Sequence, residues 1–109
     1  MTHEEICTYE VCKLAKKKGF DVPTAKNYRH ENGTTCLAPT KSLLQRWLRE
    51  EKRIHMAVFP NITNTFKFYY IVYNKGNKFW KPIYITHSDF ITYELALEDA
   101  LKYALENLV

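Results

Sequence analysis

Cysteine and histidine, the residue types that most often carry chemistry, are scattered along this chain. They comprise Cys7, Cys12, Cys36, His3, His30, His55 and His87. A metal site needs clustered ligands at a suitable spacing, whereas Cys7 and Cys12 lie five residues apart on an expected helix and point in different directions. His30 and Cys36 are the one pair that we would test for zinc. We therefore expect no metal site and no cofactor.

Catalysis by a cysteine would require an activating histidine nearby in space. A histidine partner for Cys36 is compatible with the sequence, but no spacing supports it. The chain has 3 glycines, which form no phosphate-binding loop, and its carboxylates show no pairing typical of hydrolases. The sequence therefore predicts a protein that is not an enzyme.

Rings and positive charge coincide in the segment from residue 54 to residue 87. Aromatic residues make up 15% of the chain, and this segment holds four lysines and no acidic residue, whereas residues 88–109 carry five acidic residues and one lysine. The candidate binding residues are Tyr69, Tyr73, Trp80, Tyr84, Lys67, Lys78 and Lys81. Such a combination can dock a protein or stack on nucleic-acid bases.

Three segments have the features of helices that would position these residues. The expected helices are 3–18, 40–51 and 93–108. The first begins with a capping box at Thr2 and Glu5 and ends before Gly19. The second repeats apolar residues at helical spacing around Trp47, which we interpret as a core residue, and the third is capped by Thr92.

Three further segments alternate in the manner of strands and are expected to pair as an antiparallel meander. The expected strands are 54–59, 66–73 and 79–86. Pro82 must lie at an edge or at a bulge, because it cannot donate a hydrogen bond within the sheet. Residues 20–39 form a long connection, in which a short edge strand near residues 26–30 or 34–37 would be hidden.

The length of 109 residues and the hydrophobic content of 46% indicate a single domain over residues 1–109. Within it we expect an N-terminal helix plus a long connection (1–39) and an αβββα core (40–108). No run approaches the ~20 apolar residues of a membrane span, and the N-terminus is acidic where a signal peptide would be basic. An odd number of cysteines suits reduced thiols, so we expect a cytoplasmic protein with no membrane partner.

The expected fold class is α+β, with two N-terminal helices, a three-strand antiparallel meander and a C-terminal helix packed on the sheet. The order over residues 40–108 resembles the outline of double-stranded RNA-binding domains, whose last helix presents lysines to phosphates. Here that position holds Thr92, Tyr93 and Glu94, and the negative charge of Glu94 disfavours that activity.

Several distinct short stretches, spread over nearly the whole chain, together carry a resemblance to a known family. They are Lys18-Gly19-Phe20-Asp21-Val22-Pro23, Ala38-Pro39-Thr40, Trp47-Leu48-Arg49-Glu50, Ile54-His55 and Thr92-Tyr93-Glu94 with Ala96-Leu97-Glu98. In these the chain resembles an uncharacterised family of small hypothetical proteins from phages and mobile elements of gut Bacteroidetes. The resemblance implies a phage or prophage gene expressed in a bacterial cytoplasm, and it implies no functional residue.

The meander offers the one surface to which a function can be attached. If two helices cover one side of it, the other side presents some of His55, Phe59, Tyr69, Tyr73, Trp80 and Tyr84, with Lys67, Lys75, Lys78 and Lys81 around them. Either the helix at 3–18 covers this side as ordinary core, or the side binds something. We expect a non-enzymatic, phage-type accessory protein whose partner is a host protein, a phage protein or a second copy. The alternative is nucleic-acid or nucleotide binding by the same rings and lysines.

Overall fold

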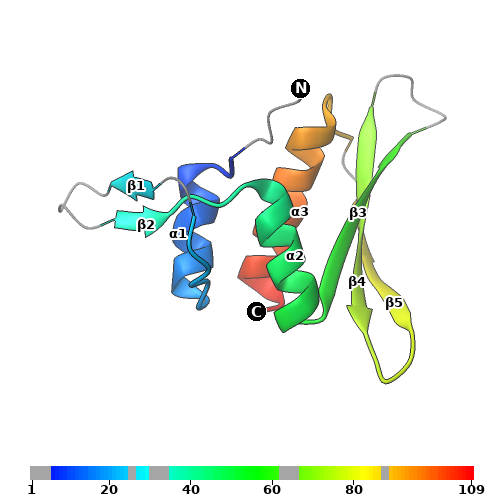
Figure 1. The fold of residues 1–109 in the computed structure, drawn as a ribbon. Coiled ribbons are helices and arrows are strands. Elements are labelled where there is room, and N and C mark those ends of the chain that lie inside the picture. The colour runs from blue at the N-terminus through cyan, green and yellow to red at the C-terminus, as the bar shows by residue number, and fades with distance from the viewer. Residues whose placement is uncertain (1–5, 25–26, 30–34, 62–66, 87–88) are drawn as a thin grey trace.

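The computed structural model describes residues 6–24, 27–29, 35–61, 67–86 and 89–109. Within them the chain forms an α+β fold of three helices and five strands (Figure 1). In chain order these are α1 (Tyr9–Lys17), β1 (Asn27–Arg29), β2 (Thr35–Leu37), α2 (Lys41–Glu51), β3 (Ile54–Pro60), β4 (Phe68–Lys75), β5 (Trp80–Ile85) and α3 (Tyr93–Asn107). The expected order of two consecutive N-terminal helices is wrong, because two strands lie between α1 and α2.

Helix α1 begins at Tyr9 rather than at residue 3. Thr8 is its N-cap, and the Thr8 hydroxyl accepts a hydrogen bond from the first turn at 3.4 Å. Ahead of the cap, the Cys7 amide donates to the Pro39 carbonyl at 2.9 Å, which holds this stretch against the chain that leads into α2. The expected capping box at residues 2–5 lies outside the described residues. The expected stop at Gly19 is confirmed, since Gly19 follows the C-cap with a φ of 97° that a glycine adopts without strain.

The connection between α1 and α2 is not structureless. Strands β1 and β2 pair antiparallel in a small sheet of their own, with Tyr28 opposite Cys36. Both positions at which an edge strand was suspected are therefore strands, and they pair with each other. Cys36 and Ala38 are buried in the main core, which anchors this hairpin to the rest of the molecule.

Helices α2 and α3 lie close to their expected bounds because each has a threonine N-cap. The Thr40 hydroxyl accepts from the Leu43 amide at 3.1 Å, and the Thr92 hydroxyl accepts from the Leu95 amide at 3.0 Å. Trp47 of α2 is buried and meets Phe20 edge to face, with ring centroids 5.3 Å apart. Its interpretation as a core residue is confirmed.

The main sheet is a meander in the order β3-β4-β5, antiparallel throughout. Tyr73 pairs with Pro82 whereas Val72 pairs with Tyr84, so Ile83 is an extra residue at a β-bulge. The expectation that Pro82 lies at an edge or a bulge is confirmed on both counts. The bulge changes which side chains of β5 share a face, and this matters for the site described below.

All three helices lie on one side of the main sheet (Figure 1). Helices α2 and α3 pack on the sheet, whereas α1 packs on α3 and β2. Between these layers lies the core, in which Met56, Tyr70 and Val72 of the sheet are buried against leucines and alanines of α2 and α3. No helix in the described parts of the chain is both long enough and apolar enough to cross a membrane.

Candidate functional site

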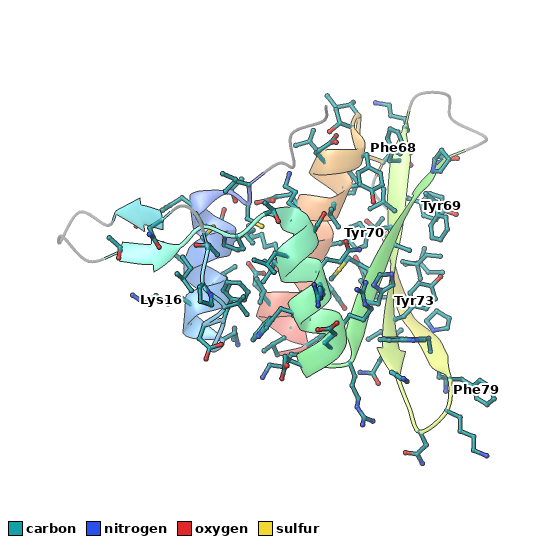
Figure 2. The ribbon with its side chains drawn as sticks, in the orientation of Figure 1. Lys16, Phe68, Tyr69, Tyr70, Tyr73 and Phe79 are labelled. Carbon is teal, nitrogen blue, oxygen red and sulfur yellow. The ribbon has the colours of Figure 1, made fainter. Side chains whose placement is uncertain are left out.

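The side of the sheet that faces away from the helices is largely apolar, and no helix or strand that the structure describes covers it. It is formed by His55, Ala57, Phe59, Tyr69, Ile71, Tyr73, Lys75, Trp80, Pro82 and Ile85, which we call the open face. On β3 and β4 these residues alternate with buried residues of the core, so they project from the opposite side, and the β5 members pair with them in the register of the sheet. Figure 2 shows Tyr69 and Tyr73 on this side of β4, whereas Phe68 and Tyr70 point toward the helices.

Exposure is highest on β5, where Ile85 is 51% and Trp80 is 38% exposed. On the other two strands, Phe59, Tyr69 and Tyr73 are half-buried by their neighbours, and the rings of Phe59 and Tyr69 stack with centroids 5.6 Å apart. Helix α1 lies behind α3 and does not cover these rings. The open face is therefore a solvent-facing apolar surface rather than a second core.

Three of the four predicted ring positions do lie on the open face, namely Tyr69, Tyr73 and Trp80. Tyr84 does not, and its expected placement there is wrong. Its ring stacks on Tyr103 of α3 with centroids 4.1 Å apart and planes inclined by 14°. The cause is the bulge at Ile83, which turns Tyr84 to the helix side although Trp80, Pro82 and Tyr84 follow a strict alternation in sequence.

The same bulge brings Ile85 to the open face opposite Ile71. Neither isoleucine was among the predicted site residues, and together with Ala57 and Pro82 they make the centre of this face aliphatic. The period-two pattern of β4 does place Ile71 beside Tyr69 and Tyr73. No sequence signal places Ile85, because its side depends on the bulge.

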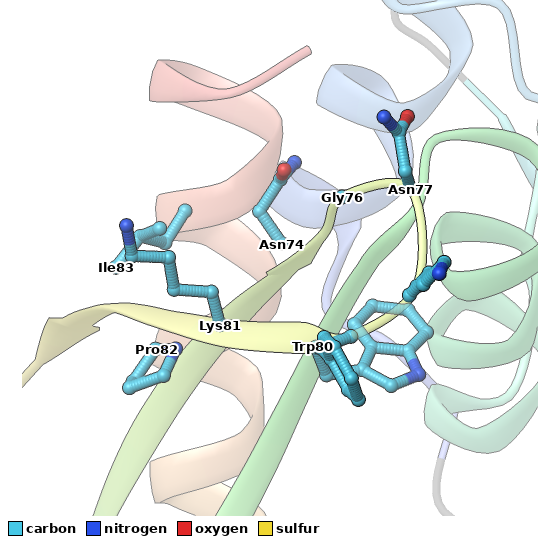
Figure 3. Close-up of a pocket in the computed structure, with 9 residues that line it drawn as sticks. Asn74, Gly76, Asn77, Trp80, Lys81, Pro82 and Ile83 are labelled. Atoms are coloured by element: carbon cyan, nitrogen blue, oxygen red, sulfur yellow. The ribbon is translucent and has the colours of Figure 1, made fainter.

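The predicted lysines lie around the open face rather than within it. Lys67 lies just before β4 and is half-buried, and Lys78 lies exposed in the turn between β4 and β5. Lys81 pairs with Asn74 on the helix-facing side of the protruding hairpin. Figure 3 shows Lys81 and Ile83 pointing one way from β5, and Trp80 and Pro82 pointing the other way. Lys75, at the end of β4, lies over the Trp80 ring at 5.9 Å from its centroid.

Two concavities adjoin Trp80 at the hairpin end of the sheet. One, of about 610 Å³, is lined by Phe79, Trp80, Pro82 and Ile83 among other hairpin residues (Figure 3). The other, of about 500 Å³, lies toward α2 and is lined by Arg49, Glu50, Arg53, Lys75, Gly76, Asn77 and Trp80. The first is mainly apolar, and the second is lined by three basic residues and one acidic residue.

His55 lies beside the second concavity. Its ring meets Trp80 edge to face, with centroids 6.0 Å apart, and its Nδ1 atom is buried without a hydrogen-bond partner. Burial, together with the positive charge of Arg49, lowers the pKa of His55 below its ordinary value. The ring is therefore neutral near pH 7.

The three cysteines are buried as thiols near the interface of α1 and β2. Burial raises the pKa of Cys7 far above its ordinary value, and burial with the nearby Cys36 raises the pKa of Cys12 to about 12. These shifts oppose the thiolate that a nucleophile requires. Among the described residues no group of three or more histidine, cysteine or acidic side chains could hold a metal ion. His30, His87 and His3 lie outside the described residues, and so does the suggested pairing of His30 with Cys36.

Comparison of the chain with protein-family models, with curated proteins and with solved structures finds no match in any of the three. The function proposed below is therefore derived from the geometry of the open face.

Proposed function

We propose that this protein is a non-enzymatic binding protein that docks a different protein on the open face of its sheet. The observation that supports this is the aliphatic and aromatic surface opposite the helix layer, with Ile85 51% exposed on it. Exposed apolar surface of this kind costs free energy in an isolated protein and usually marks an interaction site. In the setting implied by the family resemblance, the partner would be a host or phage protein in the bacterial cytoplasm.

The distribution of charge favours a protein over a strand of nucleic acid. Single-strand binding surfaces combine stacking rings with cations that follow the backbone across the surface. Here Lys67 lies at one end of the sheet, and Lys75 and Lys78 lie at the other. Between these ends the surface carries no charge, as in the centre of a protein interface.

Charge also favours a different protein over a second copy. The strands β3, β4 and β5 contain no acidic residue, so two open faces brought together would offer no strand carboxylate to Lys75 of either copy. A partner with an apolar centre and acidic residues at its rim would complement both features. We therefore assign the open face to such a partner.

The size of the open face indicates the kind of complex. The three strands are 7, 8 and 6 residues long, which gives a surface of roughly 14 Å by 25 Å, on the order of 350 Å² in projection. This lies below the ~800 Å² per partner of a stable interface. A transient complex, or one extended by the hairpin beyond the sheet, is expected.

Ile85 and Ile91 provide a matched test of this proposal. Ile85→Lys places a charge on the open face, and Ile91→Lys places the same charge outside the sheet at a site that is 65% exposed. Proteins captured from nuclease-treated lysate of the bacterial host would be identified, purified and titrated calorimetrically against each variant. We expect Ile85→Lys to weaken binding by at least about tenfold and Ile91→Lys to leave it unchanged, with equal thermal stability for both.

Three results would contradict the proposal. Equal binding by the two variants would remove the open face from the interface. Capture that disappears after nuclease treatment would indicate a nucleic-acid ligand instead. Dimerisation of the wild-type chain in sedimentation velocity, abolished by Ile85→Lys, would make a second copy the occupant.

A further inference from the structure

We propose that the corner between the end of α2 and the β4–β5 turn binds a mononucleotide, with its phosphate held by Arg49, Arg53 and Lys75 and its base against Trp80. These four residues, which we call the basic corner, line the concavity of about 500 Å³. Its volume lies within the range of small-molecule sites. The proposal does not depend on the docking of a protein on the open face.

The charges in the basic corner are concentrated and uncompensated. Glu50 is the one acidic residue among those lining the concavity, and its carboxylate is already paired with Arg46 at 3.2 Å. In the described parts of the chain, no carboxylate forms an ion pair with Arg49, Arg53 or Lys75. Two guanidinium groups and an ammonium group suit a phosphate dianion better than a single carboxylate, because the dianion carries more negative charge and offers more oxygens to the two guanidinium groups.

The backbone of Arg53 is a second observation that points to the same site. Helix α2 ends at the C-cap Lys52, and the residue after such a cap is usually a glycine in the left-handed conformation. Here that residue is Arg53, with a φ of 58°, the one described non-glycine residue with a positive φ. Its carbonyl accepts from the Lys75 amide at 2.9 Å, which fixes the turn beside β4. A positive φ is uncommon for a residue other than glycine, and such conformations cluster at functional sites.

Trp80 distinguishes a nucleotide from a simple anion. Its indole lines the basic concavity and also the neighbouring apolar one, and it is 38% exposed. An exposed ring beside clustered cations can stack on a base while the cations hold its phosphate. Since the cations are gathered at one point and do not continue along the sheet, the site fits one nucleotide better than a strand.

Calorimetric titrations at low ionic strength would compare adenosine 5′-monophosphate, inorganic phosphate and adenosine. We expect the nucleotide to bind about tenfold or more tightly than either component. Arg53→Gly should weaken nucleotide binding by about tenfold, and its melting temperature should equal or exceed that of the wild type because glycine relieves the strain. Trp80→Ala should reduce nucleotide affinity to that of phosphate. Lys17→Ala, which removes one exposed charge on α1, is the control and should change nothing.

The histidine beside the site gives an independent readout. A bound phosphate dianion would raise the pKa of His55, which nuclear magnetic resonance can follow with the nucleotide present and absent. Nucleotide binding no tighter than that of phosphate would overturn the assignment. So would unchanged binding by Arg53→Gly, equal weakening by Lys17→Ala, or an oligothymidylate that binds more tightly than the mononucleotide. None of these results bears on the Ile85 test, so failure of this site and failure of the docking proposal can be told apart.

Discussion

The rings of Tyr84 on β5 and Tyr103 on α3 lie almost parallel, with centroids 4.1 Å apart. Tyr84 also lies 6.1 Å from the ring of Tyr70, which is buried in the core. Strand β5 is one of the two edge strands of the sheet, and this stack ties it to the helix layer. Tyr84 is therefore part of the fold, whereas Ile85, the next residue along, faces solvent.

We expect Tyr84→Ala to lower the free energy of unfolding by about 2 kcal/mol, because it removes a half-buried ring from two aromatic contacts. Ile85→Ala, on the open face, should cost less than about 1 kcal/mol. Urea denaturation followed by circular dichroism would measure both. A smaller loss for Tyr84→Ala than for Ile85→Ala would mean that the stack contributes nothing to stability.

The bulge at Ile83 shows where sequence patterns stop being sufficient. Alternation assigns the core side of β3 and β4 correctly, since Met56, Tyr70 and Val72 are buried and these strands run without interruption. On β5 the extra residue reverses the sides after Pro82, so Tyr84 and Ile85 exchange places relative to a regular strand. A bulge depends on pairing with β4, which a single-strand pattern does not contain.

The segment between α1 and α2 shows the same dependence on contacts between residues that are distant in sequence. Helix α2 was predictable from apolar residues at helical spacing, and α3 from a threonine cap followed by such a run, because these signals are local. Strands β1 and β2 are each three residues long and exist because they pair with each other. The start of α1 was placed too early. Cys7, ahead of the helix, is held by its hydrogen bond to Pro39, and a contact between residues so far apart in sequence leaves no local signal. The cluster of Arg49, Arg53 and Lys75 was also missed, because its members come from the end of α2 and from β4, which are distant in sequence.

The pH dependence of stability provides a test for His55. Its pKa is held below the value of about 6.5 that an unfolded histidine has, so protons bind the unfolded chain more tightly. The folded state therefore favours the neutral form of His55. The resulting contribution to the free energy of unfolding is present above about pH 6.5 and is lost as the pH falls through the lower pKa of the folded state.

His55→Asn should therefore lose less stability than the wild type between about pH 7.5 and pH 5. Denaturation midpoints at a series of pH values would show a smaller decrease toward acid for the variant than for the wild type. Parallel curves would mean that His55 has the same pKa in both states.

Thiol reactivity tests whether any cysteine is activated. Cys7, Cys12 and Cys36 are buried, and the raised pKa values of Cys7 and Cys12 leave almost no thiolate at pH 8. We expect Ellman's reagent to label the native protein at least about a hundredfold more slowly than the denatured protein, which should yield three equivalents. Rapid labelling of one native thiol would indicate an activated nucleophile and would contradict the non-enzymatic proposal.

A buried ion pair, Lys41 with Glu98, joins the three helices. Lys41, the first residue of α2, lies 3.5 Å from Glu98 of α3, and their side chains are only 7% and 14% exposed. Glu98 also accepts from the amide of Thr8 at 2.9 Å and from the Thr8 hydroxyl, which caps α1. The Lys41 ammonium donates to the Glu94 carbonyl at 3.2 Å. Removal of either member would leave the other charge buried without this ion pair.

Lys41→Met and Glu98→Gln should each cost about 3 kcal/mol, and the double variant should cost clearly less than their sum, because no uncompensated charge remains in it. The matched control is the pair Arg46 and Glu50, which is 3.2 Å apart on the exposed side of α2. Its coupling should stay below about 0.5 kcal/mol, since water screens exposed pairs. Double-mutant cycles from urea denaturation would measure both couplings. If the two values were equal, burial would not strengthen the Lys41–Glu98 pair.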